Sequence, residues 1–155
     1  MKNLLIIISL CLVLPACQNS GDSAGTEGQD PPQSMVKKEP ASDGKGVGEI
    51  KQVTLENPLD QEMVKKGKAI YEMKCSACHK LTDQRVVGPG WAGLTKIRKP
   101  EWIMNMINNV DSMRAEDPIA SQLLEECLVR MPNQNISIGD SRDILEFMRQ
   151  NDGEE

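Results

Sequence analysis

The chain contains a single histidine, His79, which closes the pentapeptide Cys75-Ser76-Ala77-Cys78-His79. One imidazole excludes every site that needs two or three of them, such as His-rich zinc and copper centres. Residues three apart share one face at helical pitch, so both thiols of the pentapeptide point to the same side, with the imidazole next to them. The chemistry of this place must therefore be built from two sulfurs and one imidazole.

The arrangement Cys-x-x-Cys-His is the attachment motif of c-type haem, in which both thiols bond to the porphyrin and the histidine binds its iron. A zinc site, a redox dithiol and a disulfide are the competing interpretations. Zinc needs a second pair of ligands, for which the folded part offers only Cys127. A thioredoxin-like dithiol needs a βαβ context that the sequence lacks. We therefore expect one covalent haem c on Cys75 and Cys78 with His79 as an iron ligand, and a buried, inert thiol at Cys127.

Aromatic residues are scarce in this chain. Among 155 residues there are only four, Tyr71, Trp91, Trp102 and Phe147, whereas a domain of this size is normally organised around more large flat side chains. A porphyrin held by two covalent bonds would supply the missing apolar body, so we expect the haem to be part of the core and the apoprotein to be poorly folded. The formal net charge of −5 argues against non-specific binding of nucleic acid.

The N-terminal residues have the features of an export signal. Lys2 provides a short positive region, and the apolar stretch from Leu4 to Leu14 is too short for a bilayer-spanning helix of about 20 residues. The sequence Leu14-Pro15-Ala16-Cys17 resembles the lipobox of bacterial lipoproteins. This implies a signal peptide over 1–16 and an acylated Cys17 that anchors the protein to a membrane of the cell envelope, on the periplasmic side. The alternative is an ordinary secretory signal that leaves Cys17 free.

Residues 17–56 are predicted to form a flexible linker between this anchor and a folded domain. Residues 18–49 include six Gly, three Pro and four Ser among 32 positions, and such a composition cannot bury enough apolar surface to offset the entropy of ordering. As a flexible coil it would reach roughly 30 Å. The folded domain is expected over residues 57–152.

Within residues 57–152 the apolar pattern has the period of a helix. Four helices are predicted: from a cap at Asn57-Pro58 to the region of Cys75, from near Pro100 to Val110, from Asp117-Pro118 onward, and from a cap at Ser137 to about residue 150. Irregular connections are expected at 80–99 and 129–136. No stretch of useful length alternates with period two, so we expect an all-α fold.

The sixth position of a haem iron in this chain needs a ligand other than histidine. Of the eight methionines of the mature chain, Met131 is the best placed, because Pro132 disfavours helical backbone at Met131 and holds it extended. Met104, Met106 and Met113 lie in or beside an amphipathic helix and are expected to fill the core. An open sixth site is the alternative.

Residues 66–149 as a whole resemble the class I cytochromes c, small bacterial proteins with one haem. Besides the pentapeptide, the matching features are a GxxxF/Y motif on the first helix, a Gly-Pro pair after the haem site, a Met-Pro pair at the distal ligand, and two positions of the last helix that pack on the first: Gly67 and Tyr71, Gly88-Pro89, Met131-Pro132, and Ile144 with Phe147. The resemblance implies the small cytochrome c fold around one covalently attached haem.

The resemblance also implies roles for individual residues. The carbonyl of Pro89 would accept a hydrogen bond from His79 Nδ1, and His79 and Met131 would be the two axial ligands of the iron. Trp91 and Trp102 would each approach a haem propionate, or serve as plain buried aromatics.

The expected function is electron transfer. By its resemblance the chain is a monomeric electron carrier and not an enzyme, which passes single electrons from a quinol-oxidising complex to a terminal reductase or oxidase, such as nitrous-oxide reductase. Related cytochromes often dock on redox partners through a basic rim around the haem edge, and lysines flank the pentapeptide here: Lys65, Lys66, Lys68, Lys74 and Lys80. The alternatives are a peroxidase-like haem enzyme or gas sensor with an open iron site, and a structural lipoprotein that never receives haem.

Overall fold

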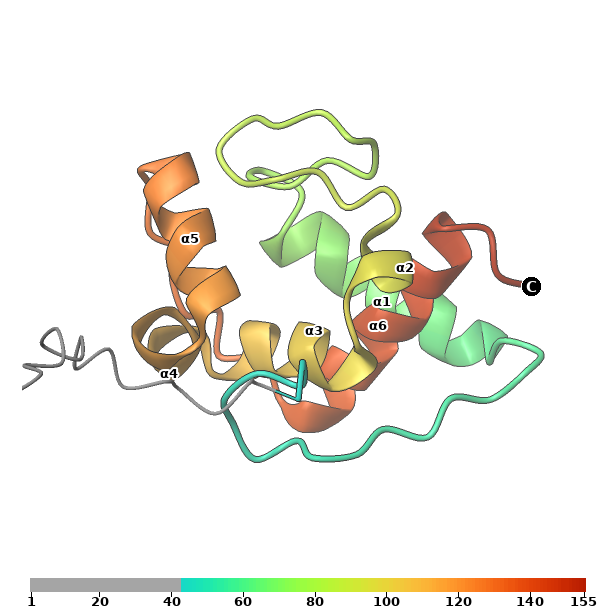
Figure 1. Cartoon of the computed structure of the whole chain (residues 1–155). Coiled ribbons are helices and arrows are strands. Elements are labelled where there is room, and N and C mark those ends of the chain that lie inside the picture. The colour runs from blue at the N-terminus through green and yellow to red at the C-terminus, as the bar shows by residue number, and fades with distance from the viewer. Residues whose placement is uncertain (1–42) are drawn as a thin grey trace, which may run out of the picture. The chain divides into compact units, whose positions relative to one another are not determined.

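The structure is a computed structural model that describes residues 43–155. The signal peptide expected over 1–16, the lipidation site at Cys17 and the linker as far as residue 42 lie outside the described residues. The described part contains six helices and no strand (Figure 1), which confirms the all-α fold. None of the helices in this part is long and apolar enough to cross a membrane.

The helices are α1 over Gln61–Lys74, α2 over Leu94–Ile97, α3 over Pro100–Asn108, α4 over Val110–Glu116, α5 over Pro118–Cys127 and α6 over Ile138–Asn151. Four of them, α1, α3, α5 and α6, lie where the apolar pattern predicts helices. The pattern does not predict α2 and α4, because elements of four and seven residues are too short to show a helical period. The backbone of Asn109, with φ −131° and ψ 46°, separates α3 from α4 and so ends the predicted helix before Val110.

Side-chain caps set where several helices begin. Asp60 accepts hydrogen bonds from two backbone N–H groups in the first turn of α1. This helix therefore begins at Gln61, and the predicted cap at Asn57-Pro58 is wrong. The predicted cap Ser137 is confirmed, because its side chain accepts a hydrogen bond from the N–H of Asp140 in the first turn of α6. Asp117, just before the third predicted helix, accepts from two N–H groups in the first turn of α5.

The first and last helices cross in close contact (Figure 1). Gly67 allows this approach, because a Cβ atom there would collide with the backbone carbonyl of Asp143 in α6. On the same interface the rings of Tyr71 and Phe147 have centroids 5.5 Å apart, and Ile144 is fully buried. The predicted packing of the last helix on the first is confirmed, and it fixes the end of α1, which leads into the pentapeptide, against the core.

The folded part begins earlier than the sequence predicts. Residues 43–60, which we call the N-terminal strap, run along the helices as an ordered segment (teal in Figure 1). The buried Asn105 of α3 holds the strap: its Nδ2 donates to the carbonyls of Lys45 and Ile50 at 3.0 and 2.9 Å, and its Oδ1 accepts from the N–H of Ile50 at 3.2 Å. The predicted domain boundary at residue 57 is therefore wrong, since composition alone does not reveal a tertiary contact of this kind.

Candidate cofactor site

The pentapeptide forms a tight turn at the C-terminal end of α1. The backbone N–H groups of Cys78 and His79 both donate to the carbonyl of Cys75, at 3.1 and 2.9 Å. The hydroxyl of Tyr71 donates to the carbonyl of His79 at 2.8 Å and so ties the turn back to α1. The two cysteines, the imidazole and the helix are thereby linked by backbone and side-chain hydrogen bonds.

The His79 ring is held in one orientation. Its Nδ1 donates to the carbonyl of Pro89 at 2.8 Å, which is the predicted contact, and a Cβ atom at Gly88 would collide with the ring. Burial lowers the pKa of His79, against the raising effect of the Pro89 hydrogen bond, so the imidazole is neutral at neutral pH. Because a carbonyl can only accept, Nδ1 carries the proton and Nε2 is left free for a metal.

The thiols of Cys75 and Cys78 are free and half-buried. Burial raises the pKa of the Cys75 thiol to about 11, against the lowering effect of Lys74, whereas a reactive dithiol needs a lowered pKa. Within residues 43–155, no three or more His, Cys, Asp or Glu side chains come together in a group able to hold a metal ion. The zinc, dithiol and disulfide interpretations therefore find no support in the described residues.

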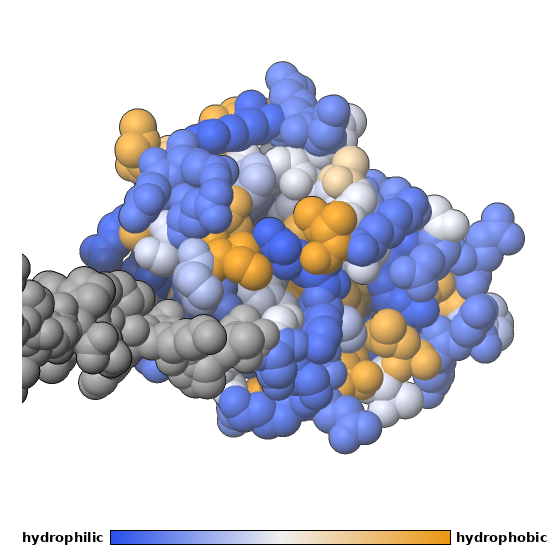
Figure 2. Space-filling model, in the orientation of Figure 1, coloured by the Kyte–Doolittle hydropathy of each residue, from blue (hydrophilic) through white to orange (hydrophobic). Residues whose placement is uncertain are grey.

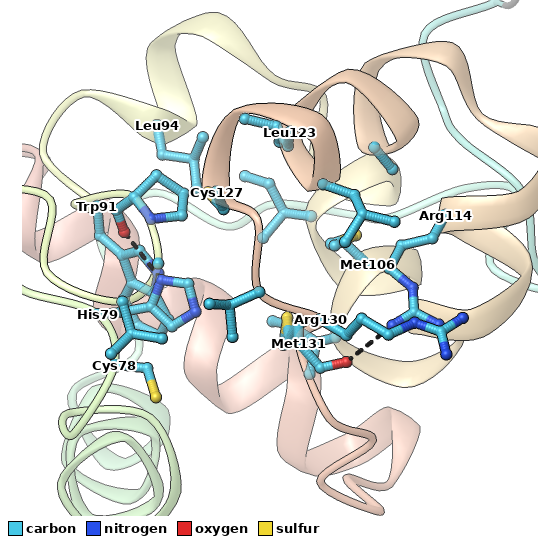
Figure 3. Close-up of a pocket in the computed structure, with 18 of the residues that line it drawn as sticks. Cys78, His79, Trp91, Leu94, Met106, Arg114, Leu123, Cys127, Arg130 and Met131 are labelled. Atoms are coloured by element: carbon cyan, nitrogen blue, oxygen red, sulfur yellow. Dashed lines mark hydrogen bonds between the residues drawn. The ribbon is translucent and has the colours of Figure 1, made fainter.

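An apolar cavity opens beside His79 (Figures 2 and 3). One wall is formed by the loop that follows the pentapeptide, with Pro89 and Trp91, and the other by α3, α5 and the segment around Met131. Figure 3 shows His79 and Met131 on different walls. Apart from two arginines, the lining contributed by the described residues is aliphatic, aromatic or sulfur-bearing. These residues fit a haem, because a flat apolar porphyrin needs thiols at its edge, an imidazole on one face and apolar walls.

Three methionines line this cavity, Met106, Met131 and Met148. Met131 reaches it from the irregular segment before α6, as predicted. Met106 is half-buried and packs against the core from the cavity wall, whereas Met104 and Met113, 2% and 0% exposed, fill the core as expected. Met131 therefore offers a thioether to a cofactor in the cavity, from a different wall than the imidazole of His79.

The two tryptophans have different surroundings. Trp102 is buried and donates from Nε1 to Oδ1 of Asp117 at 3.1 Å, so its N–H is engaged and it serves as a buried aromatic. Trp91 lies between Tyr71 and His79, with ring centroids 4.9 and 5.6 Å away. Both tryptophans line the cavity, and the contact of Trp91 with the ring of His79 helps to hold the imidazole in place.

Sequence reasoning did not identify Arg114 as a residue of this site. It belongs to α4, lines the cavity, and donates from Nη1 to the carbonyl of Met131 at 3.3 Å (Figure 3). Cys127, expected to be buried, is half-buried and also lines the cavity. Neither position carries a signal in the sequence, since both depend on how α4 and α5 fold against the Met131 segment.

Comparisons with known proteins agree with this geometry. The family model described as Cytochrome c matches residues 64–152. A solved structure of cytochrome c from Rhodothermus marinus is 34% identical, covers 70% of this chain and 93% of that chain, and has a TM-score of 0.67. An engineered cytochrome c from the same organism is 33% identical over 70% of this chain and 94% of that chain, with a TM-score of 0.66. No curated protein matches the chain.

Proposed function

This chain belongs to the cytochrome c family, and from that premise we propose that it is a membrane-tethered carrier of single electrons. Proteins of this family are generally electron carriers that bind haem c covalently, and haem c is the cofactor of this chain. When bound, haem c supplies an iron that takes up and releases one electron. Cys75 and Cys78 would hold it covalently, and His79 and Met131 would be the protein ligands of its iron.

The placement of His79 and Met131 on different walls of one apolar cavity carries this proposal. If both residues stay bound to the iron, they would exclude a substrate or a gas from it. Pairing an imidazole with a thioether also raises the reduction potential relative to two imidazoles. A site of this kind exchanges electrons without exchanging ligands.

Carbon monoxide binding tests this function against the alternative of a haem enzyme or gas sensor. We expect the purified protein to be reduced reversibly by one electron, and the reduced form to keep its absorption spectrum when carbon monoxide is added, because Met131 would already be bound to the iron. Strong binding of carbon monoxide would support the alternative. Covalent haem staining of the denatured protein tests the third possibility, a structural lipoprotein without haem.

We propose that redox partners contact the mouth of the cavity. The loop after the pentapeptide and the residues that follow α5 both line the cavity, and both carry exposed apolar side chains: Val86, Val87, Leu128 and Val129. Val87 and Val129 line the cavity itself. Arg85 donates to the backbone carbonyl of Glu126, which joins the two segments. The resulting apolar mouth offers a partner a desolvated approach to the cofactor.

A basic rim is the second part of the docking proposal. Lys65, Lys66 and Lys68 are exposed on α1, and Lys74 and Lys80 are exposed on either side of the pentapeptide. Positive charge around the docking site speeds the approach of an acidic partner, and salt screens that attraction. We therefore expect the rate of electron transfer to fall as ionic strength rises. A rate that does not change with ionic strength would contradict the basic rim.

The finer part of the proposal concerns location and partners. The resemblance of Leu14–Cys17 to a lipobox supports an anchor on Cys17 at the periplasmic side of a membrane. There the carrier would accept electrons from a quinol-oxidising complex and deliver them to a terminal reductase or oxidase, with nitrous-oxide reductase as one such acceptor. C17A should release the protein into the soluble fraction, and unchanged retention by membranes would contradict the anchor.

A further inference from the structure

The segment that carries Met131 is tied to the domain by side chains. Within the described residues, the backbone of residues 129–136 makes no hydrogen bond to the backbone of another element. Three side chains hold its carbonyls instead: Arg114 Nη1 donates to Met131 at 3.3 Å, Lys74 Nζ to Gln134 at 3.0 Å, and Asn108 Nδ2 to Ile136 at 2.7 Å. The first of these bonds is made at the residue proposed to bind the iron.

Arg114 carries its charge in a buried position. The side chain is 9% exposed, and Nη2 pairs with Asp111 Oδ1 at 2.7 Å on the outer side, where Asp111 is 70% exposed. The Nε atom is buried and has no hydrogen-bond partner among the described residues. Burying a guanidinium is costly unless it is fully paired. A single exposed carboxylate therefore does not account for an arginine in the wall of an apolar cavity.

A positive charge beside an iron ligand acts differently on the two oxidation states. The ferric site has one more positive charge than the ferrous site, so a nearby guanidinium that water screens little disfavours the ferric state. The same guanidinium restrains the Met131 segment through its carbonyl (Figure 3). We infer that Arg114 is a positioning residue that keeps Met131 at the iron and raises the reduction potential. This inference rests on the proposed function, because it requires Met131 to be the ligand.

The test measures two properties of the haem-loaded full chain. One is the midpoint potential, and the other is the affinity of the oxidised protein for imidazole, which must displace Met131 to bind. R114Q removes the charge and weakens the hold on the segment. It should lower the midpoint potential and tighten imidazole binding about tenfold, the factor expected when one hydrogen bond from a charged donor is lost.

R114K separates the two effects of Arg114. It keeps the charge, but one ammonium group cannot hold Asp111 and Met131 as the planar guanidinium does. Its midpoint potential should stay near that of the parent, whereas imidazole should bind more tightly than to the parent. If R114Q cannot be loaded with haem, the imidazole affinity of the R114K protein is the test. An R114K protein with the parent's imidazole affinity would overturn the inference.

One further variant is the matched control. R130Q makes the same charge change at Arg130, which lines the same cavity but is exposed, so that water screens its charge. It should keep the parent's potential and imidazole affinity. R114Q and R114K proteins that both match R130Q in midpoint potential and in imidazole affinity would contradict the inference.

M131A distinguishes a failure of this inference from a failure of the proposed function. An M131A protein that binds imidazole no more tightly than the parent would show that the proposed function fails, since Met131 is then not the ligand.

Discussion

Gly88 and Pro89 act together on the ring of His79. The Pro89 carbonyl determines which nitrogen carries the proton, and Gly88 leaves room for the ring, because a Cβ atom there would come too close to Cε1 and Nδ1. This dipeptide therefore controls the orientation of the imidazole that we propose as an iron ligand.

We predict that G88A displaces the imidazole of His79. Overpacking of this kind costs about 1–3 kcal/mol, so the haem-loaded protein should unfold at a lower temperature and its absorption spectrum should report altered iron ligation. G139A is the control, since the nearest atom to a Cβ at Gly139 is Ser137 Oγ, 3.8 Å away. The G139A protein should unfold at no lower temperature than the parent and should keep the parent's absorption spectrum. Equal behaviour of the two variants would contradict the role of Gly88.

A second prediction concerns Tyr71. Y71F keeps the ring but loses the hydrogen bond to the His79 carbonyl, so the free energy of unfolding should fall by about 0.5–1.5 kcal/mol at neutral pH. Burial raises the pKa of Tyr71 above its ordinary 10.0. Above pH 10.0 the unfolded state therefore loses this proton first, and the stabilisation by the hydroxyl should shrink as pH rises. Denaturant unfolding of both proteins measures this, and a difference that is independent of pH would contradict it.

Some residues of the site can be predicted from the sequence and others cannot. The cysteines and histidine of the pentapeptide are neighbours in the chain, so their spacing alone carries the chemistry. Pro89 was identified through the family resemblance, and Met131 through the effect of Pro132 on the backbone. Arg114 was not predicted, because its contact with Met131 joins two segments that no periodic pattern connects.

The N-terminal strap is an element of the fold although it has no regular secondary structure. Near its beginning, the N–H of Val47 lies 3.0 Å from the sulfur of Met113 in α4. Near its end, Arg149 of α6 donates to the carbonyl of Glu56 at 3.1 Å. Both ends are thus attached to helices, and Asn105 of α3 holds the middle.

We predict that N105A costs about 2–4 kcal/mol in the free energy of unfolding, because three hydrogen bonds to the strap are lost and buried backbone groups are left unpaired. N109A is the matched control, since Asn109 makes one longer bond to the strap, at 3.4 Å to the carbonyl of Val47. Denaturant unfolding of the haem-loaded proteins measures the free energy of unfolding of both variants.

A chain that starts at residue 57 should likewise be less stable than one that starts at residue 43. Equal stability of the two chains would support the prediction that the residues before 57 are a flexible linker.

Elements were predictable where they are long and amphipathic. The helices α1, α3, α5 and α6 each present an apolar stripe, which is why the sequence pattern locates them. The start of α1 was misplaced because two competing caps, Asn57-Pro58 and Asp60, lie within one turn of each other. The order of the strap depends on the side chain of Asn105, a contact distant in sequence, and no local pattern reports it.

On the scale of the whole domain, the cavity lies between α5 and the packed pair of helices α1 and α6. In Figure 1, α5 stands apart from the crossing of α1 and α6, and the cavity lies between them, lined by Leu123 and Leu124 of α5 and by Met148 of α6. The scarcity of aromatic residues predicts that a cofactor completes the core, and an apolar cavity in this position agrees with that. The apolar mouth was not predicted, because exposure of Val87 and Val129 follows from how the chain folds.

We predict that the domain loses order unevenly without haem. In C75A/C78A, which cannot attach haem, α5 and the Met131 segment should lose protection from hydrogen exchange, because their main apolar contact is gone. The crossing of α1 and α6 should keep more of its protection, since it is packed without the cofactor. Hydrogen exchange resolved along the chain measures this. The same protection with and without haem would contradict a structural role for the cofactor.

The central claim is that the iron is held between His79 and Met131, and the far-red absorption of the oxidised protein tests it most directly. A thioether bound to ferric haem gives a weak band in this region. We expect the band in the purified protein, its loss in M131A, and its retention in M106A, which removes another thioether from the same cavity. Absence of the band from the parent protein, or its survival in M131A, would contradict the account.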